Sequence, residues 1–292
     1  MAIKPILHAL TQDARASLEA RLAFANPRVP PILIYQMGKV GSTTIYRSLK
    51  AASVPNPVLH LHFLSEDLSG YKEAAQQAGL FPIPYHLVLG DTVRKFLIPG
   101  VRCKIISLVR DPVALAISAI FENPAFFQEN IYTSQKTIDP EKTCRYLEQR
   151  QTELTFLDYA NEWFDKELKR VFDIDVFADP FALDAGYRTY RSASVEALVL
   201  RLEDLSTKGP GAIAEFLGFA EPIRLVRANV RSELSAREAY QKVVNQIRLE
   251  ESLCREIYTS RFSRHFYSEA MLEAFLLKWT RTEARHSLKS PG

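Results

Sequence analysis

Residues 32–44 read ILIYQMGKVGSTT, a short apolar run that changes into a loop of glycines, a lysine and three hydroxyl side chains. The apolar run is typical of a buried strand, and the residues from Ser42 to Ala52 predict a helix. The first N–H groups of a helix have no partner within the helix, and the helix dipole adds positive potential there. A loop in this position therefore predicts a site for an anion.

The loop combines backbone freedom with donors that suit an anion. Gly38 and Gly41 permit backbone conformations that a side chain would block. The predicted binding residues are Gly38, Lys39, Val40, Gly41, Ser42, Thr43 and Thr44. In the GxxxxGK[ST] loop the lysine follows the second glycine and a hydroxyl binds magnesium. Here Lys39 lies between the glycines, so we expect no metal. The other interpretation is an ordinary strand-to-helix turn with a surface lysine.

A second strand end carries an arginine. The stretch KIISLV is the clearest strand of the chain, and Arg110-Asp111-Pro112 follows it. Asp111 is predicted to cap a helix that begins at Pro112. An arginine at the carboxyl end of a parallel strand lies at the ligand-binding edge of the sheet, and its guanidinium group matches a phosphate. Ser118 lies eight residues after Arg110 in the same helix. The alternative is a structural contact of Arg110 with Asp111, with Ser118 facing solvent.

Strands that alternate with helices predict an α/β fold with a parallel sheet covered on both faces. PVLHLHF and ALVLRL read as strands, YHLVLG as a short strand before a helix capped by Asp91, and FDIDVF as extended. The spacing of Leu7, Leu10, Ala14, Leu18 and Leu22 predicts an amphipathic helix within residues 1–25 that packs in front of the domain. Residues 139–170 and the last third read as helical. We therefore predict one domain over residues 1–292 with a helical C-terminal part.

Composition and charge exclude several classes of protein. Hydrophobic residues make up 47% and charged residues 24% of the chain, which is typical of a globular protein with a full core. A net charge of +3, with basic residues scattered among acids, argues against nucleic acid as a partner. The three cysteines are far apart and form no metal-binding pattern, so we expect a reduced, cytoplasmic compartment. No 18-residue apolar span occurs, so we expect no membrane insertion.

These stretches together resemble the sulfotransferase superfamily that takes a sulfuryl group from 3′-phosphoadenosine 5′-phosphosulfate (PAPS). QMGKVGSTT is similar to its 5′-phosphosulfate loop, VRDPVALAIS to its 3′-phosphate element, and LVLRLEDLSTKGPGAIAEFLGF to a strand, acidic turn and helix that it contains. FDIDVFADPF and YTSRFSRHFYS resemble a branch labelled as capsular polysaccharide synthesis proteins. The resemblance runs from about Ile32 to Phe266.

The resemblance implies a P-loop-like α/β fold and an enzyme that uses PAPS. Lys39 would contact the sulfuryl group and the bridging oxygen, and the hydroxyls of residues 42–44 would line the 5′-phosphosulfate. Arg110 and Ser118 would bind the ribose 3′-phosphate. The acceptor would be a hydroxyl of a small molecule or carbohydrate. The chain departs from the family where a glycine-rich basic lid is expected, because RLVRANVRSELSAREAY has Arg227 and Arg231 but no glycine.

Transfer to a hydroxyl needs a general base, and His62 is the candidate that we favour. His60 and His62 alternate on one predicted strand, so their side chains share a face. His62 is nearer the carboxyl end, where the site of such a sheet opens, and the pKa of histidine suits a base near neutrality. His60 would orient or pack. His86, Glu66 and Asp67 are the other candidates, and a purely structural role for both strand histidines is equally open.

Two other functions fit parts of the sequence. A P-loop kinase or nucleotide hydrolase would require magnesium and ATP, and the position of Lys39 argues against it. A degenerate relative could bind a nucleotide or protein without catalysis, although Lys39, Arg110 and Ser118 are all present. The sequence names neither the acceptor nor the oligomeric state.

Overall fold

The computed structural model describes residues 3–77, 79–80, 83–122, 131–134, 137–149, 156–226 and 234–280. The chain divides into two compact units. The first comprises residues 1–110 and 160–229, and the second comprises residues 111–159 and 230–292. The sheet and the predicted anion loop, residues 38–44, belong to the first unit. No helix in the described ranges is long and apolar enough to cross a membrane.

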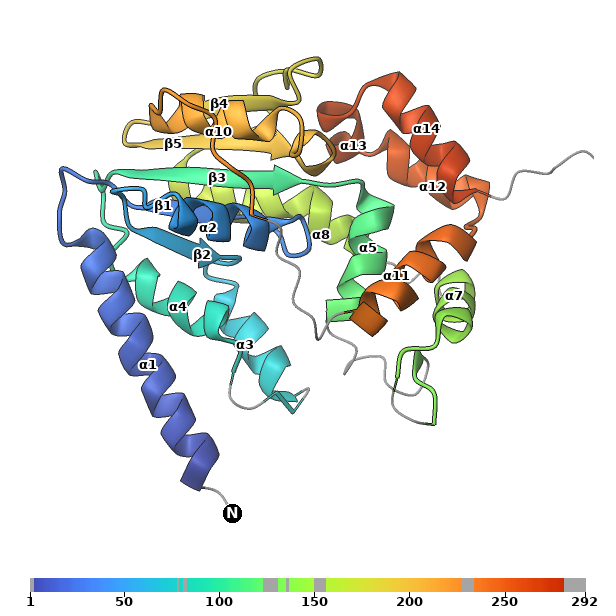
Figure 1. Ribbon diagram of the computed structural model, residues 1–292, viewed down its shortest axis with the longest axis horizontal. Coiled ribbons are helices and arrows are strands. Elements are labelled where there is room, and N and C mark those ends of the chain that lie inside the picture. The colour runs from blue at the N-terminus through green and yellow to red at the C-terminus, as the bar shows by residue number, and fades with distance from the viewer. Residues whose placement is uncertain are drawn as a thin grey trace, which may run out of the picture. The chain divides into compact units, whose positions relative to one another are not determined.

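The first unit is built on a five-stranded sheet in the order β2-β1-β3-β5-β4 (Figure 1). The strands are β1 (Ile32–Tyr35), β2 (Val58–Leu61), β3 (Cys103–Val109), β4 (Tyr187–Arg191) and β5 (Val195–Arg201). The strands β2, β1, β3 and β5 are parallel, and β4 pairs antiparallel with β5 at the edge. The mixed α/β architecture and the mostly parallel sheet flanked by helices confirm the predicted fold class at this level.

Helices cover both faces of the sheet. The helices of this unit are α1 (Ile3–Phe24), α2 (Ser42–Ala51), α3 (Leu68–Gln77), α4 (Tyr85–Arg94), the end of α8 (Phe156–Trp163), the π-helix η3 (Phe164–Lys169), α9 (Arg170–Phe172), the 3₁₀ turn η4 (Leu202–Asp204) and α10 (Gly209–Leu217).

Two aromatic contacts show which face each helix covers. Tyr46 of α2 stacks on His60, with ring centroids 5.6 Å apart, and His60 is paired with Ile34. Trp163 of α8 packs on Tyr35, the residue after Ile34, at 5.1 Å. Because successive side chains of a strand point to opposite faces, α2 and the end of α8 lie on opposite sides of β1 and β2 (Figure 1).

Helix α1 forms as predicted but packs through a different face. The predicted stripe is wrong as the packing face, because Leu10, Leu18 and Leu22 are 61%, 59% and 64% exposed. The buried side chains are instead Ala16, Ala20 and Ala23. Small alanines let α1 lie close to α4, where Tyr85 donates a hydrogen bond to Glu19 Oε2 at 2.5 Å. Just beyond the end of α4, Phe96 stacks on Phe24 with ring centroids 5.6 Å apart.

Two predicted extended segments are not strands. YHLVLG is the first part of helix α4, which begins after Pro84, so Asp91 lies inside a helix and forms an ion pair with Lys72 at 3.1 Å instead of capping. FDIDVF forms the end of α9 and a turn. Asp173 ends α9 in the left-handed region with φ 56°, and Asp175 Oδ1 accepts a hydrogen bond from Phe177 N at 3.0 Å. In both segments short-range hydrogen bonding replaces pairing with the sheet.

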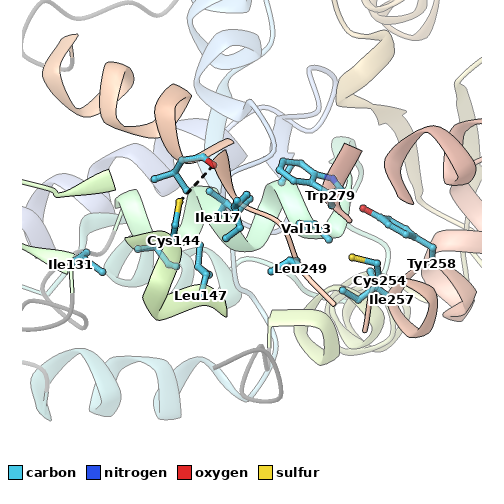
Figure 2. Close-up of a cluster of buried hydrophobic side chains, with 14 residues drawn as sticks. Val113, Ile117, Ile131, Cys144, Leu147, Leu249, Cys254, Ile257, Tyr258 and Trp279 are labelled. Atoms are coloured by element: carbon cyan, nitrogen blue, oxygen red, sulfur yellow. Dashed lines mark hydrogen bonds between the residues drawn. The ribbon is translucent and has the colours of Figure 1, made fainter. Parts of the chain in front are cut away.

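The second unit is helical in its described part. It contains α5 (Pro112–Glu122), α7 (Pro140–Gln149), α11 (Leu234–Gln246), α12 (Glu251–Thr259), α13 (Arg261–Phe266) and α14 (Glu269–Trp279). Its core is a cluster of buried side chains from α5, α7, α11 and α12, and Trp279 of α14 belongs to it (Figure 2). The three cysteines of the chain, Cys103, Cys144 and Cys254, are buried and free.

Asp111 holds the start of α5 in the second unit. Its Oδ1 accepts a hydrogen bond from Val113 N at 3.1 Å, which confirms the predicted cap at Pro112. The same carboxylate accepts hydrogen bonds from Tyr258 Oη at 2.9 Å and Trp279 Nε1 at 2.7 Å. Asp111 is 2% exposed, and its burial raises the pKa of the carboxyl group. The cap is therefore also the polar centre that joins α5 to α12 and α14.

Candidate functional site

The predicted anion loop lies between β1 and α2 with an unusual backbone. Lys39 has φ 65° and Gly41 has φ 90°, so two residues of the loop are in the left-handed region. A Cβ on Gly41 would lie 2.6 Å from Leu202 Cδ1, whereas a Cβ on Gly38 would meet nothing within 4 Å. Gly41 is therefore required by conformation and by packing. At Gly38 the loop leaves open space beside the backbone.

The loop residues differ in how accessible they are. Val40 is fully buried and anchors the loop, and Ser42 is 6% exposed at the first turn of α2. Thr43 is exposed, whereas Lys39 and Thr44 are half-buried. The N-cap residue of α2 is Gly41, which has no side chain with which to cap the helix. Of the three hydroxyl side chains of the loop, that of Thr43 is therefore the most open to solvent.

Arg110 lies against the anion loop. It follows β3 directly, and its Nη1 donates a hydrogen bond to the Lys39 carbonyl oxygen at 2.8 Å. The predicted edge of the parallel strands thus brings Lys39 and Arg110 together, although by a backbone contact that the sequence did not indicate. Ser118 is half-buried on α5, in the second unit. Its joint role with Arg110 stays a prediction.

Three histidines gather on the α2 side of the sheet. The ring centroid of His62 lies 5.0 Å from that of His60 and 4.9 Å from that of His86. His60 is on β2 and His62 comes one residue after its end. His86 comes from the first turn of α4, where the sequence had predicted a strand. The structure therefore brings together three residues that the sequence had treated as alternatives.

His62 is held by two contacts with the backbone. Its Nδ1 lies 2.9 Å from the Gln36 carbonyl oxygen, and Trp163 Nε1 donates to the His62 carbonyl oxygen at 3.1 Å. A carbonyl only accepts hydrogen bonds, so this contact assigns the proton of the neutral ring to Nδ1 and the lone pair to Nε2. Gln36 is the last residue before the anion loop. The residue that leads into the loop therefore also contacts the His62 ring.

The two neighbours of His62 resist protonation. Burial, and secondarily the charge on His62, lowers the pKa of His60 to about 3. The pKa of His86 is likewise lowered to about 3, mainly by burial and then by the charges of His62 and His60. Near neutral pH both rings are uncharged.

The carboxylate candidates have other partners. Glu66 forms an ion pair with Arg170 at 3.2 Å, and its side chain is 74% exposed. Asp67 lies 3.6 Å from the same guanidinium group. This surface arrangement points both carboxylates toward α9. Among the described residues, neither carboxylate is in contact with one of the three histidines. This favours His62 over Glu66 as the candidate base.

Sequence reasoning missed Glu167, which is 1% exposed on the π-helix η3. Its carboxylate accepts hydrogen bonds from Leu64 N at 2.8 Å, Ser65 N at 2.9 Å and Ser65 Oγ at 2.7 Å, and also from the Tyr35 hydroxyl. The contact joins the end of β1 to the segment that follows His62. No local pattern marks this glutamate, because its partners are about a hundred residues away along the chain.

Some predicted groups lie outside the described residues or form no cluster. Arg227 and Arg231 are in the segment 227–233, outside the described residues. The chain leading to them is docked on α2, since Val226 N donates to Ser48 Oγ at 2.8 Å. Among the described residues, no group of three histidine, cysteine or acidic side chains is arranged to hold a metal ion.

Residues 135–268 match a family model, NKWYS, described as a putative capsular polysaccharide synthesis protein. The match covers a little under half of the chain and includes the FDIDVF and YTSRFSRHFYS blocks. It begins after the anion loop and Arg110. The comparisons with curated proteins and with solved structures found no match. The resemblance to the capsular polysaccharide branch is thus confirmed over this stretch, whereas the sulfotransferase assignment stays a prediction.

Proposed function

We propose that the chain is a sulfotransferase that moves a sulfuryl group from PAPS to the hydroxyl of an acceptor, with carbohydrate as the favoured class. The observation that carries the proposal is the meeting of three features at one edge of the sheet. These are the Lys39 loop after β1, Arg110 after β3 and His62 after β2. The strand order with the loop after β1 supports a P-loop-like interpretation of the fold.

The groups at this edge fit the chemistry of the donor. PAPS carries phosphate and sulfate groups, and the edge offers two cationic side chains, Lys39 and Arg110, beside the open space at Gly38. Arginine and lysine are the side chains that bind such oxyanions. The family match to capsular polysaccharide synthesis supports a carbohydrate acceptor. PAPS is a substrate of this reaction and leaves as adenosine 3′,5′-bisphosphate.

In the proposed reaction the acceptor oxygen attacks sulfur while the bond from sulfur to the 5′-phosphate oxygen breaks. The acceptor proton passes to Nε2 of His62, whose Nδ1 is oriented by Gln36 O at 2.9 Å. Negative charge builds on the leaving phosphate oxygen, where Lys39 stabilises the transition state more than the ground state. As in phosphoryl transfer, the protein contributes mainly position and charge.

The test of this proposal is the effect of Lys39→Ala on the release of adenosine 3′,5′-bisphosphate from PAPS, with polysaccharide acceptors or water. We expect a loss of at least about a hundredfold in turnover, since removing one electrostatic donor costs roughly 3 kcal/mol. Nucleotide affinity should fall much less. Lys95→Ala, at an exposed position of the same unit, is the matched control. Full activity of Lys39→Ala, or a strict need for magnesium, would contradict the proposal.

A further inference from the structure

Two buried polar groups beside the anion loop have no partner among the described residues. Gln36 is 0% exposed, and neither Oε1 nor Nε2 of its amide has a hydrogen-bond partner. The same holds for Nε2 of His60. Buried polar atoms in native proteins are nearly always hydrogen-bonded, either to protein or to ordered water. Each of these atoms therefore calls for a partner in the folded molecule.

The two groups are neighbours on one face of the sheet. Ile34 pairs with His60, and the ladder continues as Gln36 N donates to Leu61 O at 3.4 Å. Because side chains alternate along a strand, Gln36 and Ile34 face the same side as His60. The Gln36 amide and the His60 ring therefore project from the same face of two adjacent parallel strands.

The chemistry of the three atoms selects one kind of partner. Gln36 Oε1 only accepts hydrogen bonds and Gln36 Nε2 only donates them, while His60 Nε2 does either according to its tautomer. An anion would be repelled by Oε1, and a cation would leave the amide N–H groups unpaired. A hydroxylic group both donates and accepts. Because these atoms are closed to solvent, the partner is a resident molecule and not an acceptor that enters during turnover.

We propose that one buried water molecule bridges the Gln36 amide and His60 Nε2 and forms a built-in site between β1 and β2. Buried waters of this kind make two to four hydrogen bonds to groups that otherwise lack partners. The water ties the two strands together where the loop and His62 leave the sheet. The backbone carbonyl oxygen of the same Gln36 lies 2.9 Å from His62 Nδ1. The site does not depend on the sulfotransferase proposal.

A double-mutant cycle on unfolding tests the bridge without any substrate. Gln36→Leu and His60→Phe keep the approximate shapes and remove the polar atoms. If a water bridges them, each single variant lowers the folded-to-unfolded ratio, by about tenfold for one lost hydrogen bond. The double variant then loses little more than the worse single variant, because both substitutions remove one shared contact. The matched control is His86→Phe, which should add independently to Gln36→Leu.

A crystal structure of the unmodified protein gives a second and direct readout, which holds even if a variant fails to fold. We expect a water within about 2.7–3.2 Å of both the Gln36 amide and His60 Nε2. A dry site, a direct contact between Gln36 and His60, or stabilisation by both single substitutions with no coupling would overturn the proposal. A protein that binds no PAPS yet holds this water would refute the proposed function alone.

Discussion

Arg110 and His62 are each held by a contact with a backbone carbonyl next to or within the loop that carries Lys39. Arg110 donates to Lys39 O at 2.8 Å, and His62 Nδ1 lies 2.9 Å from Gln36 O. The sequence predicted these residues because their charge and position after apolar runs are visible in the chain. It could not predict which carbonyl each would contact, since this depends on how β1, β2 and β3 are ordered in the sheet. The same limit hid Glu167, whose partners come from a distant segment.

At the residue scale Arg110 should confer selectivity for the 3′-phosphate. Arg110→Ala is expected to weaken binding of adenosine 3′,5′-bisphosphate by about 1–3 kcal/mol, while 5′-AMP, which lacks the partner phosphate, is nearly unaffected. Calorimetric titration of both nucleotides measures this difference. The exposed Arg102, just before β3, provides the control substitution to alanine. Equal losses for the two nucleotides would show that Arg110 acts only by holding the loop through Lys39 O.

The histidine cluster makes a pH-dependent contribution to stability. The pKa values of His60 and His86 lie near 3, below the ordinary value of 6.5. The unfolded chain therefore takes up these protons first, and the unfolding free energy falls as the pH drops from 6.5 toward 3. Each histidine contributes up to about 1.4 kcal/mol per pH unit in this window.

Denaturant unfolding of the protein between pH 7 and pH 4 measures the slope. In His86→Phe one of the two titrating groups is gone, so the pH dependence in this window should be clearly shallower than in the unmodified protein. Above pH 7 the two proteins should show equally flat profiles. A variant with the same acid slope as the unmodified protein would mean that His86 titrates at its ordinary pKa in the fold.

At the scale of elements, the strands that a loop or a helix cap follows could be predicted from the sequence. Short apolar runs that fit a strand and a helix equally well could not. The strands β1, β3 and β5 are short, buried and followed by loops or caps, and all three are confirmed. YHLVLG is as apolar as a strand, but a run of this length does not distinguish strand from helix. It is helical because α4 packs on α1, α3 and β2. The edge strand β4 reads YRTYR, which contains residues that favour strands but lacks the alternation of apolar and polar side chains that would predict one.

The loop between β1 and α2 offers a matched pair of glycines. Gly41→Ala should lower the unfolding free energy by about 1–3 kcal/mol, because φ 90° is strained for alanine and its Cβ would approach Leu202 Cδ1 to 2.6 Å. Gly38→Ala meets no neighbour within 4 Å and should change stability by no more than about 0.5 kcal/mol. Thermal or urea unfolding of the two variants compares them. Equal stability of both variants would show that the loop backbone differs from the one described.

At the scale of the whole molecule, the chain divides into a sheet unit and a helical unit, and the residues that the sequence predicts to bind the nucleotide are found in both. Lys39, Arg110 and the histidines belong to the first unit, and Ser118 to the second. The class of fold could be predicted from the alternation of apolar runs and caps. The division into units could not, because it depends on contacts of residues 111–159 with the C-terminal helices.

The central claim is that the edge of the sheet binds a nucleotide with both a 5′- and a 3′-phosphate without a metal. The most direct measurement is the melting temperature of the protein with adenosine 3′,5′-bisphosphate, ADP or ATP, each with magnesium and with a chelator. A specific ligand stabilises the fold by RT ln(1 + [L]/Kd), about 2.7 kcal/mol at a hundredfold excess over Kd. We predict the largest rise for adenosine 3′,5′-bisphosphate, unchanged by the chelator. A larger rise with ATP that requires magnesium, or no rise with any of the three, would contradict the account.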